Sequence, residues 1–310
     1  MTAAARPSPE PLVSICMPAF HADAWIGDAI ESALAQTWQN FELIVVDDAS
    51  SDATLAVARS YSDPRLRVEA NPRNLGQARN HNRAVELSSG TYVKFLHADD
   101  RLAPDCLEAM VALVEEDPGI GLVFSAREVV AESDDELAWS AEYADLHERF
   151  CGLARINDGR FLFDQLVDAG LEDNWIGEPS AVLVTRRALH EAGGFNVRVR
   201  QVLDLDLWLR IMIGHRVGFI DRPLCTYRRH AGSVSAVNRR SEGGWLDRLW
   251  LFEGLLAAGT PRRAHIKRLR REALYRATRA QARRFARGRF DTELPAYLRR
   301  RALARPGGAG

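Results

Sequence analysis

The stretch TYVKFLHADD, residues 91–100, carries a histidine and two adjacent aspartates at the end of an apolar run. Neighbouring carboxylates repel each other, so Asp99 and Asp100 need either bulk water or a cation beside them. Mg²⁺ and Mn²⁺ prefer oxygen ligands and are typically held by one or two carboxylates together with substrate phosphates. The sequence therefore predicts a divalent-metal site at Asp99 and Asp100, with a solvated turn between a strand and a helix as the plain alternative.

Apolar runs alternate with helical patterns along the first 126 residues. The runs predicted as strands are 12–18, 42–48, 65–71, 91–97 and 120–126. The segments predicted as helices lie around 24–36, 52–61, 76–88 and 104–116. This alternation indicates βαβ units, and hence an α/β fold with a mostly parallel, Rossmann-like sheet covered by helices on both faces.

Polar or turn-forming residues follow three of the predicted strands. They stand at positions 18–20, 47–50 and 97–100. Because ligands of open α/β sheets bind beyond the carboxyl ends of the strands, we expect these groups to share one crevice. The phosphate-binding loops GxGxxG and GxxxxGK(S/T) are absent from the sequence, which argues against a dinucleotide-dependent dehydrogenase and a P-loop enzyme.

The segment LDLDLWLR is predicted as a helix that is apolar on nearly every face, so each of its aspartates needs a reason. Asp206 has one, because Arg210 follows four residues later, at the spacing of a helical ion pair. Asp204 has none, since its neighbours at the same spacings are Leu207 and Trp208. A carboxylate held among apolar residues has a raised pKa and suits a general base, so Asp204 is the predicted catalytic residue. An ion pair of Asp204 with a distant arginine is the alternative.

The composition is that of a soluble globular protein, with 46% hydrophobic and 27% charged residues in a chain of 310. No run approaches the roughly 18 apolar residues that span a bilayer. The first 11 residues are expected to be a flexible tail and lack the apolar segment of a signal peptide, so we expect a cytoplasmic location. The four cysteines are scattered without a CxxC pair, which fits reduced, structural thiols.

Residues 12–240 are expected to form the main domain. Its first part is residues 12–126 and its second part is residues 127–240. Within the second part the stretch 127–175 is polar and acidic, and we expect an insertion or loop region there.

Residues 241–310 are expected to form a helical, basic extension. From Pro261 to the end, 16 Lys and Arg stand against 3 Asp and Glu, whereas the preceding 260 residues carry 25 against 39. We therefore expect this extension to dock on the acidic main domain, with peripheral contact to anionic lipid as the alternative.

The ordered set PAF, VDDASSDAT, NLGQARNHNRAV, SSGTYVKFLHADD, GEPSAVLV, LDLDLWLR and YRRHAGSVS resembles the family-2 glycosyltransferases with the GT-A fold. The resemblance covers about residues 12–236, and it implies that residues 12–126 bind the nucleotide and that residues 127–240 form the acceptor side. It implies a nucleotide-diphosphate sugar donor, a Mn²⁺ or Mg²⁺ ion, a hydroxyl acceptor and inversion at the anomeric carbon. The donor-side positions that it implies are Pro18 and Phe20 at the nucleoside, Asp48 at the base, Arg79 beside it, and Asp99 on the metal. We expect Asp100 to act behind Asp99 or as a shared metal ligand.

The loop YRRHAGSVS suits the donor diphosphate, because arginine binds such oxygens bidentately. With the resemblance, Arg228 and His230 are expected to contact the diphosphate, and solvated side chains are the alternative. Two positions depart from the family pattern: His97 replaces the first acid of Asp-x-Asp, and Leu203 replaces a glutamate before the catalytic aspartate. A neutral imidazole can still hydrogen-bond a ribose hydroxyl, so we expect His97 to contact the donor.

Three other functions are weighed against glycosyl transfer. A sugar-phosphate nucleotidyltransferase would need a glycine-rich phosphate loop after the first strand, where this chain has PAFHADAWIG. A catalytically silent nucleotide-sugar binding module would not need both Asp99 and Asp204. A nucleic-acid binder is disfavoured because the acidic main domain would repel phosphates.

Overall fold

The computed structural model describes residues 12–133, 145–233, 244–286 and 293–303. The expected flexible tail at 1–11 and the expected domain border at 240 lie outside the described residues.

Within the described residues, nine strands form one mixed sheet in the order β3-β2-β1-β4-β8-β6-β9-β5, with β7 paired to β9. The strands are β1 Val13–Ala19, β2 Phe41–Asp47, β3 Leu66–Ala70, β4 Tyr92–Phe95, β5 Arg101–Leu102, β6 Ile120–Ala131, β7 Ile156–Asp158, β8 Val182–Thr185 and β9 Arg216–Arg229. Pairing is parallel from β3 to β4 and between β6 and β9. Strand β8 lies antiparallel between β4 and β6, and β5 and β7 are antiparallel to β9. All five predicted strands are present, and the mostly parallel α/β sheet is confirmed.

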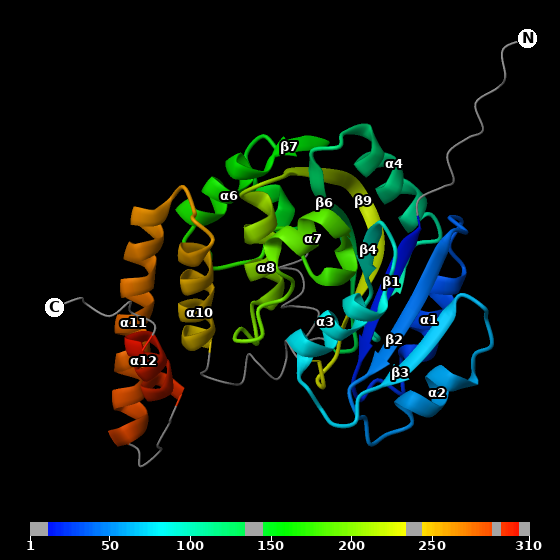
Figure 1. Cartoon of the computed structure of the whole chain (residues 1–310), viewed down its shortest axis with the longest axis horizontal. Coiled ribbons are helices and arrows are strands. Elements are labelled where there is room, and N and C mark those ends of the chain that lie inside the picture. Colours follow the sequence, from blue (N-terminus) through cyan, green and yellow to red (C-terminus); the bar gives the residue numbers. More distant parts are fainter. Residues whose placement is uncertain (1–11, 134–144, 234–243, 287–292, 304–310) are drawn as a thin grey trace, which may run out of the picture.

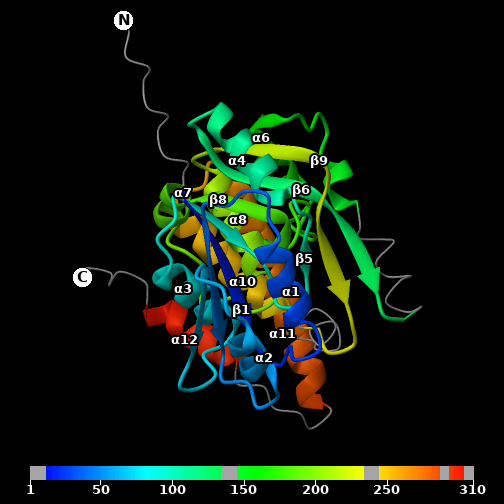
Figure 2. The same ribbon diagram turned by 90° about the vertical axis from the view of Figure 1, so that its right-hand side faces the viewer.

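The four helices predicted in the first half are also present. The helices are α1 Ile26–Leu34, α2 Thr54–Ser60, α3 Gln77–Leu87, α4 Cys106–Glu116, α6 Gly159–Asp168, α7 Arg186–Ala192, α8 Leu203–Met212, α10 Gly244–Ala257, α11 Arg263–Ala286 and α12 Glu293–Leu303, with short 3-10 turns η1 Leu146–Arg149 and η2 Pro179–Ala181. They cover both faces of the sheet (Figure 1, Figure 2).

Alternation along β1 shows how the two layers are built. Val13, Ile15 and Met17 pack with α1 and α4, whereas Cys16 packs on the opposite face with α3 and α8. Successive side chains of a strand point to opposite faces, so a strand covered on both sides must be apolar throughout. All four cysteines are free, and burial raises the pKa of the Cys16 thiol to about 12, in keeping with the predicted structural thiols.

The stretch 127–175 was expected as an insertion or loop region, and that expectation is wrong for most of its described part. Strand β6 continues to Ala131, so it crosses the expected border at residue 126, and β7 and α6 follow. Asp158 caps α6 by accepting hydrogen bonds from the amides of Arg160 and Phe161. Despite the acidic composition of this stretch, α6 is an amphipathic helix. Its buried face contributes Leu162, Phe163, Leu166 and Val167 to the core. Residues 134–144 lie outside the description.

The C-terminal extension is helical, as expected, and α10, α11 and α12 form a layer at one end of the molecule (Figure 1). Arg262 contacts Asp164 and Asp168 of α6, and Arg276 of α11 lies 3.6 Å from Glu172. The basic extension therefore docks on acidic groups of the main domain. In the described part of the chain, no helix combines the length and the apolar character needed to cross a membrane.

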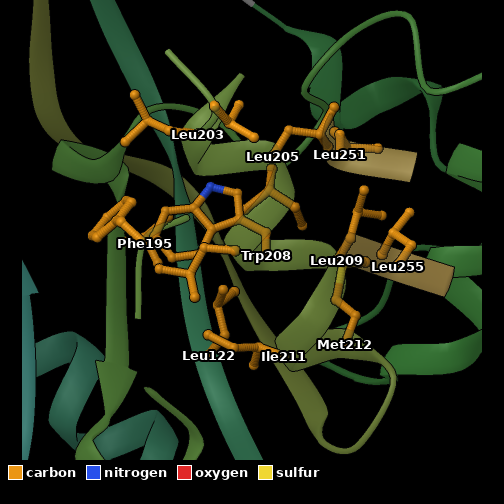
Figure 3. Packing of buried hydrophobic residues seen from close by; sticks show 14 of the residues in the cluster. Leu122, Phe195, Leu203, Leu205, Trp208, Leu209, Ile211, Met212, Leu251 and Leu255 are labelled. Carbon is orange, nitrogen blue, oxygen red and sulfur yellow. The ribbon is translucent and has the colours of Figure 1, made fainter. Parts of the chain in front are cut away.

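Helix α8 lies at the centre of this packing. Figure 3 shows Leu251 and Leu255 of α10 beside α8, whose Leu205, Trp208 and Leu209 are all buried. The predicted burial of α8 on nearly every face is confirmed.

Candidate active site

A cavity of about 910 Å³ opens beyond the carboxyl ends of β1, β2 and β4. The predicted site residues that line it are Pro18, Phe20, Asp48, Arg79, His97, Asp99, Asp204 and His230. They come from six separate segments of the sequence, so the expected convergence at one edge of the sheet is observed. Asp100 and Arg228 do not line the cavity.

Asp48 fastens the loop in front of α3. Its carboxylate accepts hydrogen bonds from the Asn71 side chain at 2.8 Å and from the amides of Leu75 and Gly76 at 2.8 and 2.9 Å. Gly76 has a φ of 86°, a backbone conformation that favours glycine. Asp48 thus shapes the cavity wall as well as facing it.

Two further donor-side residues offer surfaces that a nucleotide can use. Phe20 is 47% exposed and stacks on His21, with ring centroids 3.9 Å apart. Arg79 is exposed at the start of α3. A flat aromatic face and a guanidinium on one cavity wall suit a base and an anionic group, respectively.

His97, Asp99 and Asp100 form the metal-binding candidate. One ligand atom from each lies within 4.8 Å of the others. The donor set of one imidazole nitrogen and carboxylate oxygens fits a divalent cation such as Mn²⁺. Burial lowers the pKa of His97, so its imidazole is available in the neutral form that a metal requires.

Asp100 is fully buried, and both of its carboxylate oxygens are engaged. Oδ2 accepts a hydrogen bond from the Ser180 hydroxyl, and Oδ1 accepts one from the amide of Arg228 at 2.9 Å. Burial, together with the neighbouring charge of Asp99, raises the pKa of Asp100 well above its usual range. Lys94 is also buried and donates to the carbonyl of Ser180, which anchors this serine from behind. Asp100 therefore organises the turn under the cavity.

Asp99 faces the cavity beside His230. Its Oδ2 lies 3.2 Å from Nε2 of His230, and the His230 ring packs on Trp25 with centroids 3.9 Å apart. Burial acts to raise the pKa of Asp99, but the hydrogen bond from His230 and the proximity of His97 and His230 outweigh it, so the pKa is lowered. Asp99 is accordingly the carboxylate of this cluster held ready as an anion.

The structure places Arg228 differently from the expected diphosphate contact. Its guanidinium donates to the backbone carbonyl of Asp99 at 3.1 Å and approaches Asp28 of α1 at 3.7 Å. Successive residues of β9 point to opposite sides, and Tyr227 lines the cavity, so Arg228 turns away from it. His230 reaches the cavity from just beyond the end of β9. Of the pair predicted for the diphosphate, only His230 lies in the cavity.

Asp204 lies in the first turn of α8 and lines the cavity. The prediction that it has no partner at i+3 or i+4 is correct, but Asn174, far away in sequence, donates to its Oδ2 at 2.9 Å. Burial raises the pKa of Asp204 to about 6, and the charge of Glu178 adds to the effect, against opposing hydrogen bonds from Leu205 and Asn174. A carboxylate with such a pKa can accept a proton near neutral pH.

Asp206 points into the core, as helical geometry predicts. Its Oδ2 accepts hydrogen bonds from Nε and an Nη nitrogen of Arg210 at 3.0 and 2.6 Å. The same guanidinium donates to the carbonyls of Ala192 and Gly194. This ion pair ties α8 to the end of α7.

Sequence reasoning missed Glu178, which lines the cavity and pairs with the buried Arg127 at 2.8 Å. Its signal was an acid directly before the proline of GEPSAVLV, a motif to which no residue role was assigned. Asn174 carried no signal, because its contact with Asp204 spans 30 positions.

Comparison with known proteins identifies the family of this chain. The sequence profile described as Glycosyl transferase family 2 matches residues 14–160. Uncharacterized protein MT1568 of Mycobacterium tuberculosis is 37% identical over 259 residues, which are 82% of this chain and 80% of that protein. The putative teichuronic acid biosynthesis glycosyltransferase TuaG of Bacillus subtilis is 37% identical over 109 residues, 34% of this chain and 43% of its own length. The chain belongs to glycosyl transferase family 2.

Solved structures agree on the fold. TarS of S. aureus in complex with UDP has a TM-score of 0.61 and 17% identity, over 84% of this chain and 70% of that chain. The mannosyltransferase PcManGT from Pyrobaculum calidifontis, in complex with GDP-Man and Mn²⁺, has a TM-score of 0.55 and 20% identity, over 94% of this chain and 80% of that chain. The expected GT-A architecture is confirmed.

Proposed function

We propose that this protein is an inverting, metal-dependent glycosyltransferase that moves a sugar from a nucleotide-diphosphate sugar to an acceptor hydroxyl. The observation that carries the proposal is the single cavity that contains both Asp99 and Asp204. The named relative TuaG suggests a polysaccharide or another glycoconjugate as the setting.

The donor would lie along the wall built by Phe20, Asp48 and Arg79. Its diphosphate would reach the cluster of Asp99 and His97, which would hold Mn²⁺ or Mg²⁺. When bound, this cation supplies positive charge that stabilises the departing nucleoside diphosphate. His230 lies beside Asp99 and can donate a hydrogen bond to a diphosphate oxygen from the same side.

Asp204 would act as the general base. It accepts the proton of the acceptor hydroxyl while that oxygen forms a bond to the anomeric carbon of the sugar. The bond from the anomeric carbon to the diphosphate oxygen breaks, and its electron pair leaves with the nucleoside diphosphate. One displacement of this kind inverts the anomeric carbon and needs one carboxylate base. Asn174 holds the Asp204 carboxylate by its Oδ2.

A silent binding module is the second candidate, because Leu203 stands where the family commonly has a glutamate. The raised pKa and the cavity position of Asp204 favour catalysis instead. The base need not have an acidic neighbour at position 203, because Glu178 already places a second carboxylate on the cavity wall.

A screen of nucleotide-diphosphate sugars tests the proposal. Thermal unfolding would be followed with each donor, with and without Mn²⁺, because a ligand of the folded state raises its stability. For donors that bind, release of nucleoside diphosphate and the anomeric configuration of the product would then be measured. We expect at least one donor to bind in a Mn²⁺-dependent manner and to be consumed with inversion. Binding without consumption, with any acceptor or water, would identify a silent module, and retention of configuration would reject the single displacement.

A further inference from the structure

His97 of the metal-binding candidate contacts a second histidine, His81. Nε2 of His81, on α3, lies 3.3 Å from Nε2 of His97, and the two rings are nearly perpendicular, at 85°. His81 is 1% exposed and packs against the rings of Phe95 and Phe195. His97 lines the cavity. The pair therefore connects the core to the site.

The hydrogen bonds of this pair determine which nitrogen carries each proton. Nδ1 of His81 lies 2.9 Å from the carbonyl oxygen of Gln77, and a carbonyl can only accept, so this Nδ1 carries a hydrogen. A neutral imidazole has one N–H, which leaves Nε2 of His81 as an acceptor. Nε2 of His97 must then donate to it. The remaining nitrogen of His97, Nδ1, consequently presents a lone pair.

This lone pair faces acidic groups. Nδ1 of His97 lies 3.8 Å from Oδ2 of Asp100, which is too long for a hydrogen bond. Atoms of His97, Asp99 and Asp100 nevertheless lie within 4.8 Å of one another. An imidazole lone pair and the Asp99 carboxylate are both acceptors and cannot satisfy each other, whereas a cation between them satisfies both.

We propose that Nδ1 of His97 is a direct metal ligand alongside Asp99, and that His81 is a positioning residue that holds His97 in the tautomer required for ligation. The proposal deepens the proposed function by assigning the ligands of its metal. Both oxygens of Asp100 already accept hydrogen bonds, from Ser180 and from the amide of Arg228, so we assign the direct carboxylate ligation to Asp99, which lines the cavity. A hydrogen bond to the ring nitrogen that does not bind the metal commonly fixes the tautomer of a histidine ligand.

A nitrogen ligand changes which metals the site favours. Mg²⁺ is best suited by oxygen ligands, whereas imidazole suits later first-row metals, whose affinities rise from Mn²⁺ through Co²⁺. We therefore expect the chain to bind Co²⁺ and Mn²⁺ in preference to Mg²⁺. His97→Asp, which supplies oxygen instead, should shift the ratio of Co²⁺ to Mg²⁺ affinity by about 10-fold or more toward Mg²⁺.

Pulsed electron paramagnetic resonance of the full chain loaded with Mn²⁺ alone tests the ligand directly. We expect nitrogen hyperfine coupling from a coordinated imidazole in the wild type, and its loss in both His97→Asp and His97→Ala. His230→Gln is the matched control, because His230 also contacts Asp99 but is not the proposed ligand. Coupling should persist in this control. The assignment is overturned by absence of bound Mn²⁺, by absence of nitrogen coupling in the wild type, or by coupling that survives both changes at His97.

The positioning role is tested by Mn²⁺ affinity. His81→Leu removes the acceptor for His97 and should weaken binding about 10-fold or more, the scale of outer-sphere effects. His81→Gln offers an amide oxygen in place of Nε2 and should recover most of that loss. Equal affinities for wild type and His81→Leu, or equal losses in both variants, would reject the tautomer argument. Donor consumption is measured separately. If the ligand assignment fails but the enzyme consumes donor, the proposed function stands. If nitrogen coupling is observed in a protein that consumes no donor, the ligand assignment stands and the proposed function fails.

Discussion

Asp204 and Asp206 stand two positions apart on α8 but serve different parts of the molecule. Asp204 lines the cavity and accepts a hydrogen bond from Asn174, whereas Asp206 is buried and paired with Arg210. Residues two positions apart on a helix point about 160° away from each other. One helix thus supplies a carboxylate to the cavity and another to the core.

Replacing each aspartate with asparagine should separate the two roles. We expect Asp204→Asn to bind donor and Mn²⁺ normally but to lose turnover by a factor on the order of 10² or more, the scale of general-base catalysis. Asp206→Asn breaks a buried ion pair and should lower the free energy of unfolding by about 2 kcal/mol or more, while the folded fraction stays active. Turnover assays and urea denaturation measure the two effects. A stable, donor-binding but inert Asp206→Asn would move the base to that position.

The pKa of Asp204, raised to about 6, predicts the pH dependence. A general base works when deprotonated, so kcat should fall as the pH drops below about 6. The folded state holds this proton more tightly than the unfolded chain, whose aspartate has a pKa of about 3.9, so stability should decrease as the pH rises from about 4 to about 6. Asp204→Asn should remove this decrease and unfold at a higher temperature than wild type above pH 6. A pH profile that is flat between 5 and 7 would contradict the assignment.

Glu178 should control that pH profile through its charge. Its carboxylate contributes to the raised pKa of Asp204, so Glu178→Gln should move the acidic limb of kcat to lower pH. Glu172→Gln is the matched control, since Glu172 also lines the cavity but is not among the groups that shift the pKa of Asp204. If the acidic limb of the kcat profile lies at the same pH in both variants and in the wild type, Glu178 does not raise the pKa of Asp204.

Replacing the adjacent residues Asp99 and Asp100 with asparagine should affect Mn²⁺ binding differently. Asp99→Asn should abolish Mn²⁺-dependent donor binding. In Asp100→Asn the amide can still accept from the amide of Arg228 and donate to Ser180, so Mn²⁺ affinity should stay within about 10-fold of wild type. Calorimetric titration with Mn²⁺ distinguishes the two. The opposite ranking would make Asp100 the principal carboxylate ligand.

The C-terminal helices should stabilise the whole molecule. Ile266 of α11 is fully buried, so Ile266→Ala should lower the free energy of unfolding by about 2–4 kcal/mol. Leu298→Ala, at a side chain 41% exposed on α12, is the control and should cost far less. Similar small losses in urea denaturation would mean that α11 is not part of the cooperative core. Sedimentation with anionic vesicles that disappears on truncation at Thr260 would instead support the lipid-contact alternative.

Much of the fold could be predicted because its signals are local. Four of the five predicted strands place apolar side chains on both faces, which is what a sheet covered on two sides requires, whereas the edge strand β3 carries Arg67 and Glu69. The ion pair of Asp206 with Arg210 follows from a spacing of four residues on one helix. Even the shared cavity followed from a topological rule, since parallel strands end at one edge of the sheet.

Other features depend on contacts that no local pattern encodes. Strand β8 enters antiparallel between β4 and β6, and the turn that precedes it brings Ser180 to Asp100, 80 positions away. That contact engages the second carboxylate of an apparent metal pair. The direction of Arg228 likewise depends on the register of β9, not on its own chemistry.

The sequence by itself determined which residue types reach the edge of the sheet, because strand ends and helix faces follow from periodicity over a few positions. Only the tertiary structure decided their protonation and orientation. The base acquires its pKa from burial and from Glu178, and the tautomer of His97 depends on His81 of a different helix. Both effects act through distances of a few ångströms between segments far apart in the chain, and such distances exist only once the sheet has formed.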